Sequence, residues 1–204
     1  MLAWLKSLFS SDKELEDPMK YLIVGLGNMH PQYDDTRHNI GFDVVDHLAA
    51  WGKATFKNDT LGDVAEIKHK GRTLVLVKPS TYMNKSGKSV RYWGQKKKIQ
   101  PKNLLVVVDD LHIPFGQLRL KGKGGDGGHN GLKDINLILN TTGYSRLRVG
   151  IGSEFGKGQQ VDYVLGKWTK GEQEKLPAIL ERAGDAIKSY CTIGLGHTMT
   201  EYNK

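Results

Sequence analysis

The sequence predicts an α/β fold in which a layered sheet with some antiparallel edges forms a single domain. Short apolar runs typical of buried strands alternate along the chain with segments whose apolar residues recur at helical spacing. The run Leu104–Val108 is the most apolar and is rich in β-branched residues, which indicates a strand buried on both faces. The length of 204 residues fits one domain, or one domain with a small appendage.

The predicted elements begin after Met19 and continue to the C-terminal region. Lys70-Gly71 is a turn signal between two strand-like segments, so these segments are expected to form a hairpin. Pro177 is tolerated only in the first turn of a helix, which fits a helix that begins at Leu176. The predicted strands are Tyr21–Leu26, Val64–His69, Thr73–Val77, Leu104–Val108, Gln117–Leu120 and Leu147–Ile151, and the predicted helices are Ile40–Trp51, Ser86–Lys97, Gly131–Asn140 and Leu176–Ser189.

Residues 1–18 are expected to form an N-terminal appendage, and residues 19–204 the main domain. Apolar residues of the first ten positions recur at helical spacing, which predicts a short amphipathic helix. No run approaches the roughly 18 apolar residues of a membrane span, and the acidic residues that follow position 10 argue against a secretory signal. The single cysteine, Cys191, excludes an internal disulfide and fits a reducing compartment. We therefore expect a cytoplasmic protein.

Basic residues outnumber acidic ones by 30 to 22, which gives a formal net charge of +8. The excess is uneven, because no acidic residue occurs between Glu66 and Asp109 while basic residues recur throughout that window. We expect a positive surface that neutralises phosphates. Nucleic acid is the leading candidate partner, and a membrane surface is the second.

The candidate site lies where predicted strands end and helices begin, because ligands of α/β sheets bind beyond the carboxyl ends of the strands. His38 falls between the first strand and the next helix, and Asp109 ends the most buried strand. A carboxylate so placed orients an imidazole and stabilises its protonated form. No Gly-x-Ser-x-Gly elbow supplies a nucleophile, so we expect His38 to activate water. Taken alone, His38 is also consistent with a helix cap or a surface residue.

Three asparagines, Asn28, Asn84 and Asn130, occupy the same ends of the predicted elements. A side-chain amide provides a donor and an acceptor, which suits an ester or peptide carbonyl. Each also has a structural alternative, since Asn28 fits a turn and the other two fit helix N-caps. The glycine-rich segment Gly122–Gly128 is interpreted as a gate or cradle beside the site, with a mobile surface loop as the alternative.

Two cofactor classes are disfavoured by the spacing of residues. Gly25-Leu26-Gly27 lacks the third glycine of a dinucleotide-binding fingerprint, and His30 stands at that position. A nucleotide-binding oxidoreductase is therefore a weak alternative. The seven histidines include no His-x-x-x-His pair with acidic neighbours, so no metal site is expected.

Seven segments of the chain form a further pattern, which runs from about Met19 to the C-terminus: Tyr21–Asn28, Thr36–Phe42, Lys78–Gly87, Asp109–Leu111, Gly127–Asp134, Arg146–Gly152 and Val164–Gly166. In their order and spacing, these segments resemble bacterial-type peptidyl-tRNA hydrolases. The resemblance implies a single α/β domain with a mixed twisted β-sheet surrounded by helices, monomeric and without a metal or organic cofactor. It implies hydrolysis of the ester between a peptide and the 3′-terminal ribose of tRNA, which recycles tRNA from peptidyl-tRNA lost from ribosomes.

The resemblance also assigns roles by position. It implies that His38 is the general base and Asp109 its orienting partner. Asn28 and Asn84 are expected to position the substrate, with Asn84 polarising the ester carbonyl, and Asn130 to hold the peptide backbone or the acceptor end. The residues expected to line the cleft are Tyr33 and Met83, and the candidates for phosphate contacts are Arg119, Lys121, Lys133 and Arg148.

Two departures from the family pattern stand near the site. Met29-His30-Pro31 follows Asn28 where the family commonly continues Pro-Gly, and His112 occupies a position that is often acidic. Neither removes a proposed catalytic residue. The main alternative function is a non-catalytic RNA-binding relative, and a third possibility is association with a membrane surface through the first ten residues and the basic face.

Overall fold

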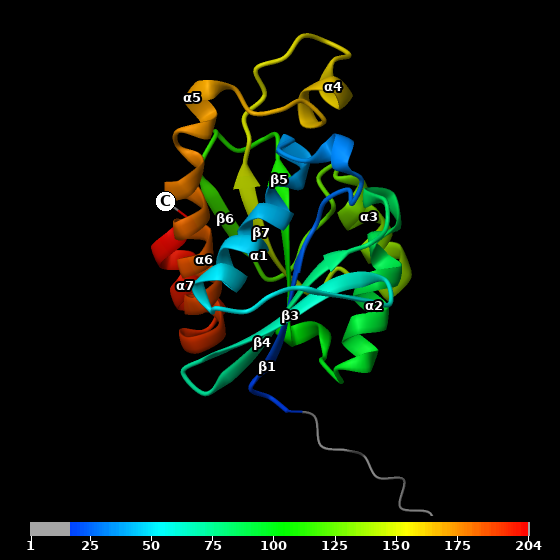
Figure 1. Ribbon diagram of the computed structural model, residues 1–204, viewed down its shortest axis with the longest axis vertical. Helices are drawn as coiled ribbons and strands as arrows, with labels where there is room; N and C mark the ends of the chain where they lie inside the picture. The colour runs from blue at the N-terminus through cyan, green and yellow to red at the C-terminus, as the bar shows by residue number, and fades with distance from the viewer. Residues whose placement is uncertain (1–16, 204) are drawn as a thin grey trace, which may run out of the picture.

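The computed structural model describes residues 17–203, which form one seven-stranded mixed sheet with helices on both faces (Figure 1). The predicted N-terminal amphipathic helix lies outside the described residues. The strands are β1 (Lys20–Gly25), β2 (Lys57–Asp59), β3 (Gly62–His69), β4 (Arg72–Pro79), β5 (Leu104–Asp110), β6 (Leu118–Lys121) and β7 (Ser145–Gly150). The helices are α1 (Ile40–Trp51), α2 (Ser86–Lys96), α3 (Asn130–Leu139), α4 (Gln160–Val164), α5 (Lys170–Gln173), α6 (Leu176–Ile193) and α7 (Leu195–Tyr202).

The sheet has a parallel centre and antiparallel edges, as the sequence predicts. Its order is β2-β3-β4-β1-β5-β7-β6, with β4, β1, β5 and β7 parallel. β3 runs antiparallel to β2 and β4, and β6 runs antiparallel to β7. All seven residues of β5 are buried, which confirms the prediction of a central strand covered on both faces.

Two apolar layers enclose the sheet. One packs α1, α6 and α7 against one face, and the other packs α2 and α3 against the opposite face (Figure 1). Alternating residues of the central strands supply both layers: Ile23 belongs to the first, whereas Leu22 and Val24 belong to the second. Because β4, β1, β5 and β7 run parallel, their carboxyl ends lie at the same edge of the sheet, where a site can form.

The predicted hairpin and the long helices are confirmed, while four short elements were missed. Lys70 and Gly71 both have positive φ, at +46° and +78°, as a two-residue turn with matching twist requires. The missed elements β2, α4 and α5 have three to five residues, which is too short for a hydrophobic period to emerge. α7 follows Gly194, whose φ of +86° ends α6.

The acid-free stretch of sequence does not form a purely basic surface. Lys78 pairs with Asp46 at 2.7 Å, and Lys96 pairs with Asp59 at 2.9 Å. Lys97 similarly pairs with an acidic residue that lies far away in sequence. The fold brings acidic residues from α1, β2 and β3 next to these three lysines, so part of the basic charge of this window is neutralised, and the phosphate-neutralising surface stays a prediction. Among the residues that the structure describes, none of the helices combines the length and the hydrophobicity needed to cross a bilayer.

Candidate active site

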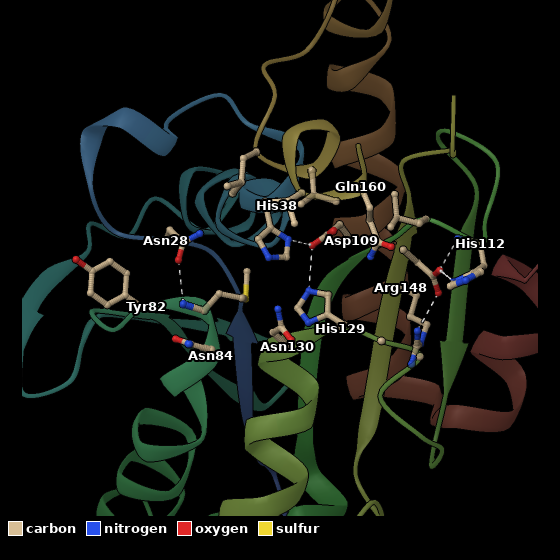
Figure 2. Close-up of a pocket in the computed structure, with 18 of the residues that line it drawn as sticks. Asn28, His38, Tyr82, Asn84, Asp109, His112, His129, Asn130, Arg148 and Gln160 are labelled. Atoms are coloured by element: carbon tan, nitrogen blue, oxygen red, sulfur yellow. Dashed lines mark hydrogen bonds and ion pairs between the residues drawn. The ribbon is translucent and has the colours of Figure 1, made fainter. Parts of the chain in front are cut away.

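A cleft of about 480 Å³ opens at the carboxyl ends of β1 and β5, beside the starts of α2 and α3 (Figure 2). It gathers residues from seven separate segments of the chain, which is the arrangement expected at the strand ends of an α/β sheet. The described residues that line it are Asn28, His38, Tyr82, Met83, Asn84, Lys85, Asp109, Asp110, Leu111, His112, Gly127, Gly128, His129, Asn130, Arg148, Gln160, Val161, Val164 and Leu165.

Close packing of two glycines brings His38 to the sheet. Gly25 ends β1 and Gly41 lies in the first turn of α1, and a Cβ on either would overlap the backbone of the opposite segment. The absence of both side chains lets α1 approach the end of β1. The short 3₁₀ turn η2 (Arg37–Asn39), which carries His38, is thereby held over the end of the neighbouring strand β5.

Asp109 lies between two imidazoles. Its Oδ1 is 2.8 Å from Nδ1 of His38 and 3.1 Å from Nε2 of His129, and the two rings are 5.1 Å apart (Figure 2). His129 also forms the N-cap of α3, because its Nδ1 accepts from the backbone N–H groups of Gly131 and Leu132 at 3.1 and 3.3 Å. Nδ1 therefore holds the lone pair, and Nε2 carries the hydrogen that is donated to Asp109.

The same reasoning shows which ring nitrogen of His38 carries the hydrogen and which has the free lone pair. Nδ1 donates to the carboxylate of Asp109, so the lone pair lies on Nε2, which points into the cleft (Figure 2). Burial alone would lower the pKa of His38, but the charge and the hydrogen bond of Asp109 outweigh burial and raise that pKa above 6.5. Burial alone would also raise the pKa of Asp109, yet the neighbouring imidazoles hold it well below its usual range.

His38, Asp109 and His129 also have the composition of a metal-binding group, with their ligand atoms within 4.8 Å of one another. Each imidazole nitrogen that faces Asp109 acts as a hydrogen-bond donor, and Nδ1 of His129 is occupied by the helix cap. A cation at this point would need lone pairs from both facing nitrogens. The hydrogen bonds therefore fit an acid–base arrangement better than a metal site.

The three asparagines surround this group but differ in their surroundings. Asn28 is 7% exposed, and its Oδ1 accepts from the backbone N–H of Met83 at 2.9 Å. Asn39 brackets the backbone of Asn28 with two hydrogen bonds, of 2.8 and 3.0 Å. Asn84 and Asn130 are exposed, and neither side-chain amide has a hydrogen-bond partner among residues 17–203. Their amides are thus available to a ligand in the cleft.

The helix-cap alternatives for Asn84 and Asn130 are not what the fold shows. The N-cap of α3 is His129, and the residue before α2 is Lys85, so neither Asn84 nor Asn130 caps a helix. Sequence reasoning missed His129 as a member of the site. The signal was present in the pair His129-Asn130 before a helix start, but only the fold brings this imidazole to Asp109.

The remaining predicted residues occupy distinct places. Met83 is 4% exposed and forms part of the cleft lining, as expected. Tyr33 is half-buried in the turn η1 (Pro31–Tyr33) and is not among the described residues that line the cleft, which departs from expectation. The side chain of His30 forms the N-cap of this turn, where its Nδ1 accepts from the backbone N–H of Gln32. His112 lines the cleft with a side chain that is 76% exposed.

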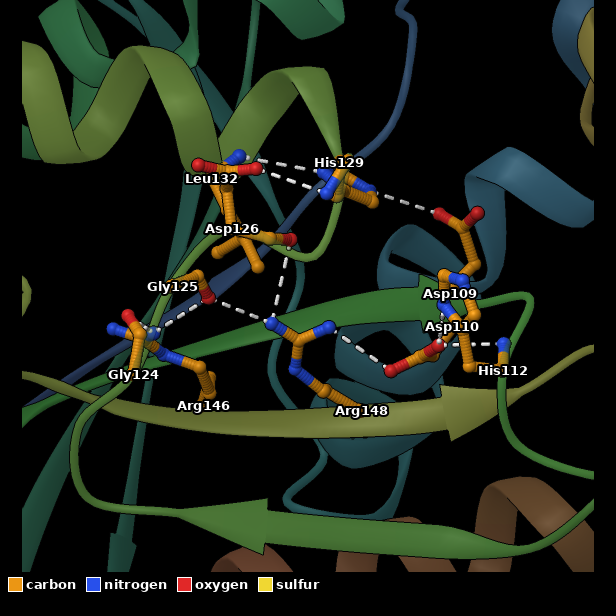
Figure 3. Close-up of polar contacts among 11 residues, drawn as sticks. Asp109, Asp110, His112, Gly124, Gly125, Asp126, His129, Leu132, Arg146 and Arg148 are labelled. Carbon is orange, nitrogen blue, oxygen red and sulfur yellow. Dashed lines mark hydrogen bonds and ion pairs between the residues drawn. The ribbon is translucent and has the colours of Figure 1, made fainter.

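Two buried arginines of β7 pin the glycine-rich segment (Figure 3). Arg146 donates to the carbonyls of Gly124, Gly125 and Thr142. Arg148 donates to the carbonyls of Gly125 and Asp126, and its Nη1 pairs with Oδ2 of Asp110 at 2.9 Å. This part of the segment is anchored through its carbonyls, which supports a cradle rather than a mobile surface loop.

Comparisons with known proteins agree with this geometry. The family model for peptidyl-tRNA hydrolase matches residues 22–204. A peptidyl-tRNA hydrolase of Cytophaga hutchinsonii is 54% identical over 185 residues, which cover 91% of this chain and 98% of that protein. One from Parabacteroides distasonis is 55% identical, with coverage of 91% and 99%. The crystal structure of peptidyl-tRNA hydrolase from Acinetobacter baumannii has a TM-score of 0.85 at 37% identity, covering 91% and 95%.

The fold is thus that of a hydrolase with a cleft at the carboxyl ends of parallel strands. The chain belongs to the peptidyl-tRNA hydrolase family.

Proposed function

We propose that the protein cleaves the ester bond between the peptide and the 3′-terminal ribose of peptidyl-tRNA, with water as the nucleophile. The observation that carries this proposal is the 2.8 Å contact between Nδ1 of His38 and Asp109, which leaves Nε2 as a base at the cleft. His38 Nε2 takes a proton from water as the oxygen attacks the ester carbonyl. The bond between the carbonyl carbon and the ribose oxygen then breaks, and the ribose oxygen takes the proton from His38 and leaves as the hydroxyl group of tRNA. A positioned base of this kind contributes about 10²–10⁴-fold to the rate.

The exposed amides support the recognition of an acyl group of variable sequence. Asn84 donates to the carbonyl oxygen as negative charge develops there, a contribution of about 10²–10³-fold in comparable sites. Asn130, the first residue of α3, holds the peptide backbone or the acceptor end. Asn28 positions the substrate through Met83, whose backbone N–H it binds at 2.9 Å. Recognition through backbone-like groups leaves the peptide side chains unread, as a recycling enzyme requires.

The edge of the sheet next to the cleft supplies a basic surface for the tRNA. Arg119 and Lys121 are exposed on β6, and they pair in register with Arg148 and Arg146 of β7. Leu118 and Leu120 alternate with them and are buried in the layer that includes α6 and α7, so the four basic residues share the other face. We assign phosphate contacts to Arg119, Lys121 and the exposed Lys133, with Arg148 at the inner end where it lines the cleft.

The proposal includes the cellular setting. Release of tRNA from peptidyl-tRNA that leaves ribosomes places the enzyme in translation, and we infer a cytoplasmic monomer of residues 19–204 that acts without a metal, an organic cofactor or a membrane partner. No specific observation favours the non-catalytic RNA-binding alternative.

Hydrolysis of an N-acetylaminoacyl-tRNA tests the function and the base together. Wild-type protein and His38→Ala are assayed with chelator present and without added metal. We expect turnover in wild type and a loss of at least about 10²-fold in the variant, with tRNA affinity unchanged. A variant that keeps more than about a tenth of the rate would remove His38 as the base, because a positioned base supplies far more than that. A wild type that binds tRNA without turnover would establish the RNA-binding alternative.

A further inference from the structure

The residue directly before His38 has a buried cationic side chain that the reaction described above does not use. Arg37 is 6% exposed, and its Nε and Nη2 donate to the two carboxylate oxygens of Glu172 at 3.2 and 2.7 Å. Its Nη1 faces the carbonyls of Gly166 and Lys167 at 3.2 and 3.0 Å. A two-pronged pair together with backbone carbonyls uses the fixed fork of the guanidinium, which lysine lacks.

Gly166 and Lys167 belong to the segment that joins α4 to α5, and Glu172 lies in α5 itself. Backbone hydrogen bonds reinforce the junction, since Arg37 N–H donates to Gly166 and Trp168 N–H donates to Asp35, at 3.1 and 3.3 Å. Glu172 is fixed independently, because the backbone N–H and the hydroxyl of Thr169 both donate to its Oε2. Arg37 therefore ties a pre-set carboxylate and the end of α4 to the turn that carries His38.

α4 forms one wall of the cleft but has little packing of its own. Val161 and Val164 of α4, together with Leu165 directly after it, are among the residues that line the cleft. All five residues of the helix are at least partly exposed, and Tyr163 lines a second cavity of about 570 Å³. A helix of one turn and a half is not stable by itself, so tertiary contacts decide its position.

We propose that Arg37 is a positioning residue for substrate binding, which holds the α4 wall at a fixed distance from His38 through Glu172. This inference rests on the proposed function. It makes Arg37 a residue that acts through α4 and leaves the His38–Asp109 pair intact, because the guanidinium contacts neither member of that pair. Loosening α4 weakens binding of the acyl group in the ground state and the transition state equally, which raises KM and leaves kcat unchanged.

The test compares Arg37→Lys and Glu172→Gln with wild type in steady-state hydrolysis of N-acetylaminoacyl-tRNA. We expect KM to rise at least about fivefold in each variant, with kcat within about threefold of wild type and an unchanged pH profile. Amide hydrogen exchange at Leu165 and Gly166, followed without substrate, is expected to become faster in both. The exchange measurement does not depend on catalysis, so it judges the Arg37 contact even if wild type shows no turnover and the proposed function fails.

Arg72→Lys is the matched control. Arg72 is another partly buried arginine that donates to backbone carbonyls, those of Lys70 and Thr192, at the opposite end of the molecule. The Arg72→Lys variant is expected to have the KM of wild type and the same amide exchange rates at Leu165 and Gly166. If KM and the exchange rates of Leu165 and Gly166 in Arg37→Lys and Glu172→Gln equal those of wild type, the proposal is overturned. A lower kcat at constant KM would also overturn it, because that pattern reports only a smaller folded fraction.

Discussion

At the scale of single residues, one carboxylate organises the chemistry of the site. Asp109 is 4% exposed and accepts from two imidazoles through the same oxygen. This arrangement fixes which nitrogen of His38 is free. Burial is the largest single effect on the pKa of His38 and lowers it, but the charge and the hydrogen bond of Asp109 together outweigh burial and raise that pKa. The base form of His38 is therefore reached at a higher pH than in an exposed histidine, and we expect activity to rise with pH through a value above 6.5.

Asp109→Asn tests this dependence. Replacing the carboxylate of Asp109 by a neutral amide removes the negative charge that raises the pKa of His38. The acid limb of the pH profile should therefore move to lower pH. The rate should fall between about 10² and 10⁴-fold, because an amide no longer fixes the correct tautomer. The measurement is kcat/KM against pH for both proteins. An acid limb that stays in place, or that moves to higher pH, would contradict the assignment of Asp109.

At the scale of elements, His129 couples the start of α3 to Asp109 and thereby to the His38–Asp109 pair. Its Nδ1 satisfies two orphan N–H groups of the helix, and the opposite nitrogen binds Asp109 at 3.1 Å. The orientation of the imidazole is therefore fixed by the helix, which in turn fixes the position of the carboxylate. Asn130 is the first residue of the same helix, so the N-terminus of α3 places both a support for Asp109 and a candidate substrate contact.

His129→Asn separates these two roles. Asparagine caps helices well but is too short to reach Asp109, so Tm should stay within about 2 °C of wild type. The rate should fall about tenfold, which corresponds to one lost charge-assisted hydrogen bond of about 1.4 kcal/mol. His129→Ala serves as the control, because it loses the cap as well and should lower stability by about 1 kcal/mol. Full activity of His129→Asn would show that one imidazole is enough to position Asp109.

At the scale of the whole molecule, the net charge is +8, and the arrangement of the strands and helices, not the order of residues in the sequence, decides where positive charge lies on the surface. Lysines of the acid-free stretch are partly neutralised by acids from other elements. The exposed basic pair on β6 lies instead at the edge strand beside the glycine-rich segment. We expect tRNA affinity to fall steeply with salt, since each neutralised phosphate adds roughly −0.7 to −0.9 to the log–log slope.

Lys121→Ala should make this slope shallower by about 0.7–0.9 while leaving kcat at saturating substrate unchanged. Lys68→Ala is the control, because Lys68 is exposed on β3 near the opposite edge of the sheet. Binding is followed by titration of tRNA at several salt concentrations. Equal slopes for Lys121→Ala and wild type would exclude the β6 face as the phosphate contact.

The sequence by itself determined the order of the long elements, the burial of β5, the hairpin turn at Lys70-Gly71 and the candidates His38, Asp109, Asn84 and Asn130. These follow from local properties: hydrophobic period, backbone preferences of glycine, and polar residues at element ends. The resemblance to peptidyl-tRNA hydrolases supplied the expected roles of those residues, which composition and spacing alone do not provide.

Only the tertiary structure decided which groups meet. His129 lies 20 positions from Asp109, and Arg37 lies 135 positions from Glu172, so neither contact has a local signal. The same holds for the anchoring of Gly124 and Gly125 by Arg146. The physical reason is common to these cases: hydrogen bonds and ion pairs depend on distances that the packing of layers sets, whereas sequence patterns record only the period of each element.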